Sequence, residues 1–224
     1  ITDTNVLVSG KEQYYFRDDK KILLLSGEEI FSAFPNNRGH LLILNGNRDF
    51  ANHDGSIRGV ISQCNRDGAI TIIAHPFDGE SAHSSESSTP WADWDVANFT
   101  GLEILNLQSE YKNQRNLRRG FFGFLDRKPR ITTNLQHASL SALAKWDELL
   151  CGGKQVVGVC GSVCANVARD NLYEGSPIRD PEHLFAAANN HLYVDDTFGK
   201  SVENDRDMIY RSLLFGRSYV AIDA

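Results

Sequence analysis

Five short apolar runs, separated by stretches with helical periodicity, occur along the 224-residue chain. Each run is rich in Leu or β-branched residues and ends at a Gly, a Pro or a polar side chain. The runs are "KILLLSG" (21–27), "HLLILNG" (40–46), "AITIIAHPF" (69–77), "LEILNL" (102–107) and "QVVGVCGS" (155–162). Strands that are apolar on both faces are typical of parallel sheets covered by helices, so we predict buried parallel strands here.

The stretches between and after these runs carry helix signals. Residues 56–67 place apolar side chains at helical spacing, with Ser56 as N-cap and Gly68 as the stop. Further helices are predicted at 139–151, 181–190 and 203–215, and "RSYVAI" (217–222) forms a last strand. This order predicts an α/β fold, a parallel sheet or barrel with right-handed crossovers, whose chemistry lies at the C-terminal ends of the strands.

Composition excludes some functions and limits others. A net charge of −6 argues against non-specific nucleic-acid binding. No apolar run approaches the ~20 residues that a membrane-spanning helix needs. Cys160 and Cys164 have a C-x-x-x-C spacing that can bind metal, but we favour buried small hydrophobic side chains as the interpretation of the cysteines.

Short polar motifs lie at or beside the ends of the apolar runs. In chain order they are "ITDTN" (1–5), "SGEEI" (26–30), "GHLLIL" (39–44), "IIAHPF" (72–77), "GLEILN" (101–106) and "GVCGSVCAN" (158–166). Together they resemble the PHP (polymerase and histidinol phosphatase) superfamily, and "LLFGRSYVAIDA" (213–224) is similar to the ending of its phosphoesterase-like branch. The resemblance implies a distorted (βα)7 barrel that holds up to three divalent metals and hydrolyses phosphate esters.

Three ligand positions of the family pattern are lost in this chain. Thr4 stands where the T-D-H-N motif has a His, and Val163 and Ala165 replace the Asp and His of G-S-D-A-H. Hydrocarbon side chains cannot bind a divalent ion, and a neutral hydroxyl is a poor ligand for one. The family's H-x-H segment would lie before Ile1. We therefore expect residues 1–224 to form a single barrel domain that lacks its first strand or strands.

Three ligand positions remain, at Glu29, His40 and His75. Two His and one carboxylate can hold one divalent ion such as Zn, Mn or Fe and leave coordination positions open. The alternative is a hydrogen-bonded polar cluster that binds no metal. The lost positions favour a reduced or dismantled metal centre, in a weakly active or non-catalytic relative of the family.

An active mononuclear metallohydrolase on a phosphate ester is the alternative function. In that case Asp3, as base or orienting residue, and Arg169 are the catalytic candidates. Arg38 and Asn106 would bind a small phosphorylated or otherwise anionic substrate.

A Ser-rich, acidic segment at 78–95 is long for a loop between strand and helix, and long loops beside a site often act as lids. A solvated insertion is the other interpretation of this segment. It contains Trp91 and Trp94, which suggest a second alternative function, a carbohydrate- or surface-associated binding domain.

Overall fold

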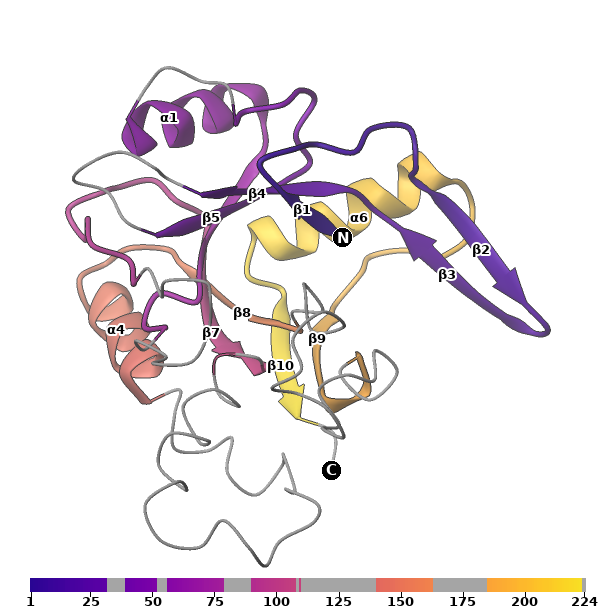
Figure 1. The fold of residues 1–224 in the computed structure, drawn as a ribbon. Coiled ribbons are helices and arrows are strands. Elements are labelled where there is room, and N and C mark those ends of the chain that lie inside the picture. The colour runs from indigo at the N-terminus through magenta and orange to yellow at the C-terminus, as the bar shows by residue number, and fades with distance from the viewer. Residues whose placement is uncertain are drawn as a thin grey trace, which may run out of the picture.

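The structure is a computed structural model that describes residues 1–31, 39–51, 56–78, 90–107, 109, 140–162 and 185–222. Its centre is a six-stranded mixed sheet with the order β1-β4-β5-β6-β7-β8 (Figure 1). These strands are β1 (Thr2–Thr4), β4 (Gly27–Phe31), β5 (His40–Leu44), β6 (Ile70–Ala74), β7 (Gly101–Asn106) and β8 (Val157–Gly161). The α/β class predicted from the sequence is confirmed.

The prediction of an all-parallel sheet is wrong for one strand. β5 runs antiparallel to both of its neighbours, β4 and β6, whereas the β1–β4, β6–β7 and β7–β8 pairs are parallel. The β4–β5 connection is short, residues 32–39, whereas a parallel pair needs a crossover of about a dozen residues or more. As a result His40, the first residue of β5, lies opposite Phe31 and Ala74, the last residues of β4 and β6.

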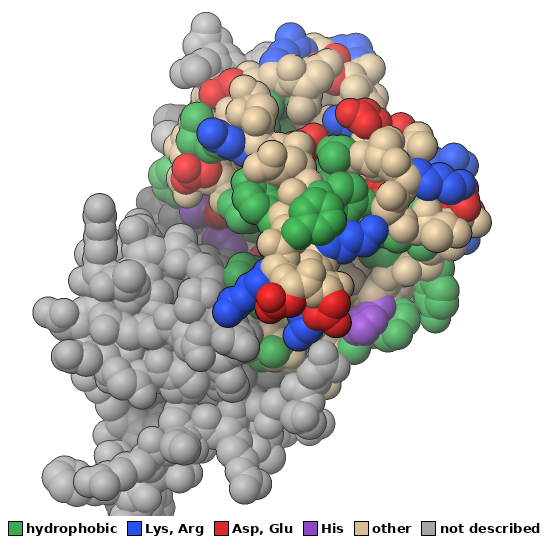
Figure 2. All heavy atoms as spheres, turned by 90° about the vertical axis from the view of Figure 1, so that its right-hand side faces the viewer, with side chains coloured by type: hydrophobic (Ala, Val, Ile, Leu, Met, Phe, Trp, Pro, Cys, Tyr) green, Lys and Arg blue, Asp and Glu red, His purple; other side chains and the backbone are tan. Residues whose placement is uncertain are grey.

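Two predicted elements are placed differently. The run 21–27 is not a core strand: its first part belongs to β3 (Lys20–Leu24), which forms a hairpin with β2 (Gln13–Arg17), and the core strand is β4. The hairpin projects from the sheet in Figure 1, and Figure 2 shows this face, where hydrophobic side chains lie among Lys and Arg. Phe16 and Ile22 are 74% and 66% exposed.

The second difference concerns the predicted helix at 181–190. Residues 188–190 belong instead to β9 (Ala188–Leu192), which pairs antiparallel with β10 (Ser218–Ile222), the predicted last strand. The side chain of Asn190 donates to the backbone carbonyl of Cys160 at 2.7 Å and accepts its N–H at 2.9 Å. The edge of β8 is therefore covered by a side chain of the hairpin instead of a further strand ladder.

Three predicted helices are confirmed, with ends shifted by a residue or two. They are α1 (Ile57–Asp67), α4 (Leu140–Cys151) and α6 (Val202–Leu214). In α1 the Ser56 hydroxyl accepts the N–H of Gly59, and Gly68 ends the helix in the left-handed conformation, with φ +74°. No helix among the described residues is long and apolar enough to cross a membrane.

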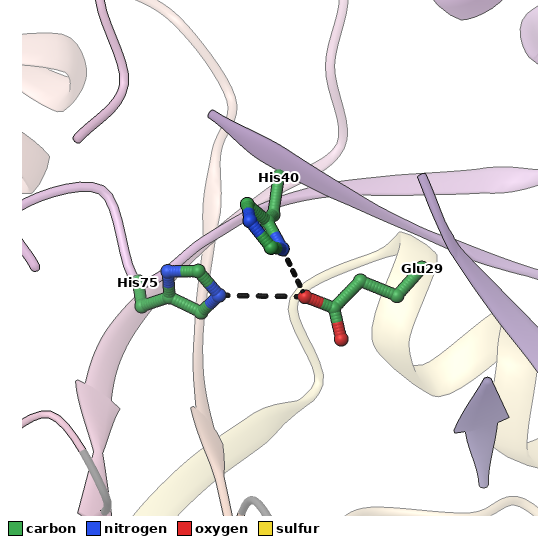
Figure 3. A group of neighbouring side chains, drawn as sticks. All are labelled: Glu29, His40 and His75. Carbon is green, nitrogen blue, oxygen red and sulfur yellow. Dashed lines mark hydrogen bonds and ion pairs between the residues drawn. The ribbon is translucent and has the colours of Figure 1, made fainter. Parts of the chain in front are cut away.

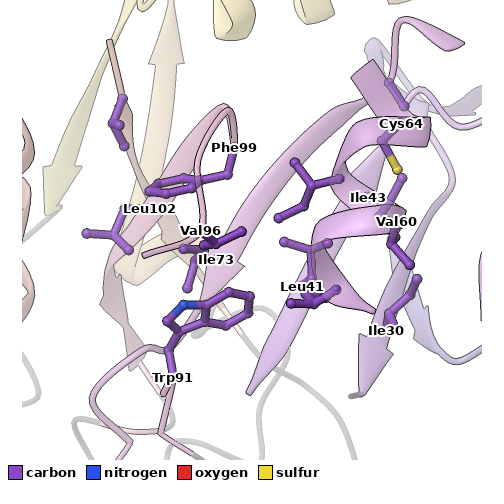
Figure 4. Packing of buried hydrophobic residues seen from close by; sticks show 14 of the residues in the cluster. Ile30, Leu41, Ile43, Val60, Cys64, Ile73, Trp91, Val96, Phe99 and Leu102 are labelled. Atoms are coloured by element: carbon purple, nitrogen blue, oxygen red, sulfur yellow. The ribbon is translucent and has the colours of Figure 1, made fainter. Parts of the chain in front are cut away.

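The central strands β6 and β7 are buried on both faces, as their apolar runs predict. On one face Leu41, Ile43, Ile73 and Leu102 pack with side chains of α1 and with Trp91, Val96 and Phe99 (Figure 4). On the other face Ile70, Ile72 and Val159 pack with Tyr210 and Leu213 of α6. Among the described residues no strand ladder joins β8 to β1, so the sheet seen here is open.

Candidate metal centre

The three predicted metal ligands lie together at the same end of three neighbouring strands. Glu29 belongs to β4, His40 opens β5, and His75 directly follows β6. Because β5 is antiparallel, the start of this strand meets the ends of its two neighbours. One ligand atom of each side chain lies within 4.8 Å of those of the other two.

The side chains converge on one oxygen atom, Oε1 of Glu29 (Figure 3). Nδ1 of His40 lies 2.5 Å from this oxygen, and Nε2 of His75 lies 3.4 Å from it. The two imidazole rings meet edge to face, with centroids 4.6 Å apart. All three side chains are between 12% and 21% exposed, so they are sheltered but still reachable from solvent.

The cluster is electrostatically coupled. Burial alone would raise the pKa of Glu29, but the hydrogen bonds and charges of His40 and His75 outweigh it and lower this pKa to about 2. Burial acts to lower the pKa of His75, yet its hydrogen bond to the carboxylate of Glu29 and the charges of Glu103, Asp78 and Glu29 raise this pKa overall. Without a metal, the carboxylate is thus stabilised in its charged form by the imidazoles.

His75 adopts a backbone conformation that is rare for a residue with a side chain. Its φ is +27°, and Pro76 follows it. Its Nδ1 is buried and has no hydrogen-bond partner among the described residues. Strained backbone of this kind persists where the surrounding structure demands it, and it is concentrated at functional sites. The donor set and the tight convergence of its atoms fit a divalent ion such as Zn, Mn or Fe.

A pocket of about 650 Å³ lies beside the cluster. Glu29 and His75 line it, together with Lys11 and apolar side chains such as Leu24 and Phe185. Among the described lining residues Lys11 is the only Lys or Arg. The arrangement therefore places possible metal ligands beside a pocket that has room for a small molecule and that contains the charge of Lys11.

The other predicted site residues are placed as follows. Asp3 and Thr4 lie in β1 and line the pocket, with Thr4 opposite Glu29 in the β1–β4 ladder. The carboxylate of Asp3 accepts the N–H of Thr4 at 2.8 Å. Asn106 also lines the pocket, but its amide is engaged: it donates to Glu103 and accepts from the N–H of Ser109. Arg38, Val163, Ala165 and Arg169 lie outside the described residues.

Glu103 is a site residue that the sequence reasoning missed. It lies in β7, is 3% exposed and lines the pocket. Burial raises its pKa, while the charge of His75 and the hydrogen bonds that it accepts oppose this. The signal was present in the sequence as a single charged residue inside the run "LEILNL", because a carboxylate is almost never buried without a partner.

The two tryptophans of the 78–95 segment do not form an exposed pair. Trp91 is 5% exposed and belongs to the core. Trp94 stacks on Phe77 with centroids 5.5 Å apart, and Nζ of Lys145 lies 4.8 Å from the centre of its ring. Residues 79–89, the centre of the predicted lid, lie outside the described residues.

Comparisons with known proteins give no independent assignment. No protein-family model matches the chain, no curated protein matches it, and no solved structure matches its fold.

Proposed function

We propose that this protein binds one divalent metal ion, Zn, Mn or Fe, through Glu29, His40 and His75. The observation that supports the proposal is the convergence of three ligand atoms of the preferred types within 4.8 Å, beside a pocket of about 650 Å³. The resemblance of the strand-end motifs to the PHP superfamily points to the same three residues.

We further propose hydrolysis of a small phosphate ester as the reaction. A divalent ion would supply Lewis acidity and lower the pKa of a water molecule. Lys11 lines the pocket, where its charge favours an anionic substrate. Asp3, which lines the pocket from β1, would orient or deprotonate a reacting group there. Two further roles remain predictions from the sequence. Arg38 would bind the negative charge of the substrate, and Arg169 would be a catalytic residue that acts on the same charge.

The same proposal includes the fold of the family, a distorted (βα)7 barrel. It is supported by the order of the ligand-bearing strands and by the β9–β10 hairpin, which covers the edge of β8 through Asn190. An experimentally determined structure of the full chain tests this point. A barrel requires the strands after β8 to lead back toward β1, and an open sheet with solvent at both edges contradicts it.

Metal analysis and calorimetry on the purified full chain test the metal centre. We expect about one equivalent of Zn²⁺ or Mn²⁺ to bind the wild type, and His40→Ala and His75→Ala to weaken binding at least tenfold, since each removes one of three ligands. His191→Ala is the matched control, because His191 lies in β9, stacked on Tyr219. Absence of stoichiometric Zn, Mn and Fe binding by the folded wild type overturns the proposal.

A non-catalytic binding module is the second candidate, and Thr4 favours it. Thr4 lies at the pocket and opposite Glu29, where the family pattern has a ligand His, and it offers only a neutral hydroxyl. Assays with p-nitrophenyl phosphate and bis(p-nitrophenyl) phosphate in Zn²⁺, Mn²⁺ or Fe²⁺ separate the candidates. Turnover that is abolished in His75→Ala excludes the non-catalytic module, whereas metal binding without turnover supports it.

A further inference from the structure

Glu103 makes two hydrogen bonds from a buried position beside the proposed metal centre. Its Oε2 accepts the backbone N–H of His75 at 2.5 Å and the side-chain amide of Asn106 at 3.1 Å. The carboxylate therefore contacts the backbone of a proposed ligand, while the imidazole of that ligand points to Glu29.

The local structure of β7 and β8 is adapted to this carboxylate. Residues 103 and 106 are three apart and would face opposite sides of a regular strand. The register between β7 and β8 shifts between Glu103 and Leu105, so a bulge turns both Glu103 and Asn106 toward the pocket. Gly161 is the ladder partner of Asn106, and a Cβ added there would come within 1.8 Å of Oε1 of Glu103. Only a glycine leaves room for the carboxylate at its present place.

Burying this carboxylate is costly, and an apolar side chain would serve core packing better. Its one evident benefit is at His75. That residue lies beyond the last ladder pair of β6, so its N–H has no strand partner, and its φ of +27° turns the chain out of the strand. The hydrogen bond from this N–H to Glu103 satisfies the donor and holds the turn.

We propose that Glu103 is a positioning residue that holds the His75 backbone in the conformation in which its imidazole meets Glu29 and His40. The inference rests on the proposed function, because it concerns the geometry of the same metal ligands. Groups that orient ligands from outside the coordination sphere matter nearly as much to metal sites as the ligands themselves.

The test measures Co²⁺ binding to the full-length protein by calorimetry and by the visible absorption of the bound ion. We expect Glu103→Ala to weaken Co²⁺ binding by about 10- to 100-fold and to alter the absorption spectrum. Glu103→Gln keeps an oxygen for the N–H of His75 and should stay within about threefold of the wild type. Gly161→Ala leaves Glu103 in the sequence but displaces its carboxylate, and should weaken binding as Glu103→Ala does.

Glu28→Ala is the matched control. Glu28 is also a buried glutamate that accepts backbone N–H groups, those of Phe50 and Ala51, but its side chain lies on the face of β4 opposite to that of Glu29. It should leave the Co²⁺ affinity and spectrum unchanged even where it lowers stability. If Glu103→Ala does not fold, the Co²⁺ affinity and spectrum of Gly161→Ala test the inference instead. Wild-type affinity and spectrum in the folded Glu103→Ala or Gly161→Ala variant overturn the inference.

If the folded wild type binds no Co²⁺, the proposed function is overturned. The positioning role of Glu103 is then tested by a measurement on the metal-free protein. The amide proton of His75, donated to a carboxylate at 2.5 Å, should resonate far downfield in the NMR spectrum. It should move upfield in Glu103→Ala and stay in place in Glu28→Ala. An unchanged His75 resonance in Glu103→Ala contradicts the positioning role in either case.

Discussion

Glu28 and Glu29 are adjacent in β4 but serve different purposes. Their side chains point to opposite faces of the strand. Glu28 is 1% exposed and accepts the N–H groups of Phe50 and Ala51, which orders the chain after β5. Glu29 faces the pocket and meets the two imidazoles. A shift of one residue in the register of β4 would exchange these roles and dismantle the cluster.

The low pKa of Glu29 predicts how the stability of the metal-free protein depends on pH. This pKa falls from its ordinary 4.5 to about 2 on folding. The resulting stabilisation is fully present above pH 4.5 and is lost as the pH falls toward 2; it amounts to on the order of 3 kcal/mol. Urea unfolding of wild type and Glu29→Gln should therefore differ by an amount that shrinks from pH 5 to pH 3.

The control for this measurement is Glu148→Gln, which changes an exposed glutamate paired with Lys145 on α4. Its effect should be small at every pH. A difference between wild type and Glu29→Gln that stays constant from pH 5 to pH 3 contradicts the coupling of Glu29 to the histidines.

The raised pKa of His75 predicts how metal binding depends on pH. Its pKa is raised above 6.5, so the stabilisation from its charged form is fully present below pH 6.5 and is lost as the pH rises through the raised value. A metal must displace this proton, so apparent Zn²⁺ affinity should rise with pH over the same range, by up to about tenfold per pH unit. Calorimetry in buffers of different ionisation enthalpy should detect the released proton, and pH-independent affinity contradicts the assignment of His75 as a ligand.

At the scale of elements, the direction of β5 assembles the site. If β5 were parallel to β4 and β6, His40 would lie at the opposite end of these strands from Glu29 and His75. In the antiparallel strand, the five-residue run His40–Leu44 begins where β4 and β6 end. The apolar pattern of the run is the same for both directions, since pattern reports burial and not orientation.

The helices depend on local signals, and the N-cap of α1 is the clearest. Ser56→Ala removes the acceptor for the N–H of Gly59 and should destabilise the protein by about 1 kcal/mol. Ser62→Ala is the matched control within the same helix, because the hydroxyl of Ser62 accepts a hydrogen bond from the exposed side chain of Arg66 and caps no backbone N–H among the described residues. Chemical denaturation measures both variants, and equal effects contradict a specific capping role.

At the scale of the molecule, α1 and α6 pack on opposite faces of the sheet, and the polar cluster lies where β4 and β6 end and β5 begins. The central strand β6 is buried at every position. Ile73 is fully buried between Leu41 and Leu102 on the face covered by α1, so Ile73→Ala should cost about 2 to 5 kcal/mol in unfolding free energy. The same change at Ile22, 66% exposed on the β2–β3 hairpin, should cost less than about 0.5 kcal/mol. Similar losses at both positions contradict this division between core and hairpin.

The sequence by itself determined the α/β class, the three helices and the metal-ligand candidates. These depend on local information: apolar periodicity, a serine before and a glycine after a helix, and short motifs at the ends of apolar runs. The sequence also marked the run 21–27 as a core strand, but its Leu-rich part belongs to the hairpin strand β3, and the core strand β4 (Gly27–Phe31) begins only at its last residue.

Only the tertiary structure decided which strand is reversed and which buried carboxylate serves the site. The antiparallel direction of β5 is seen only in its ladders with β4 and β6, and residues 188–190 pair as a strand because β10 lies beside them. Glu103 gains its proposed role from a bulge in β7, a glycine in β8 and the backbone N–H of His75 just beyond the end of β6. Such contacts join residues far apart in the chain, so their energies have no counterpart in local sequence pattern.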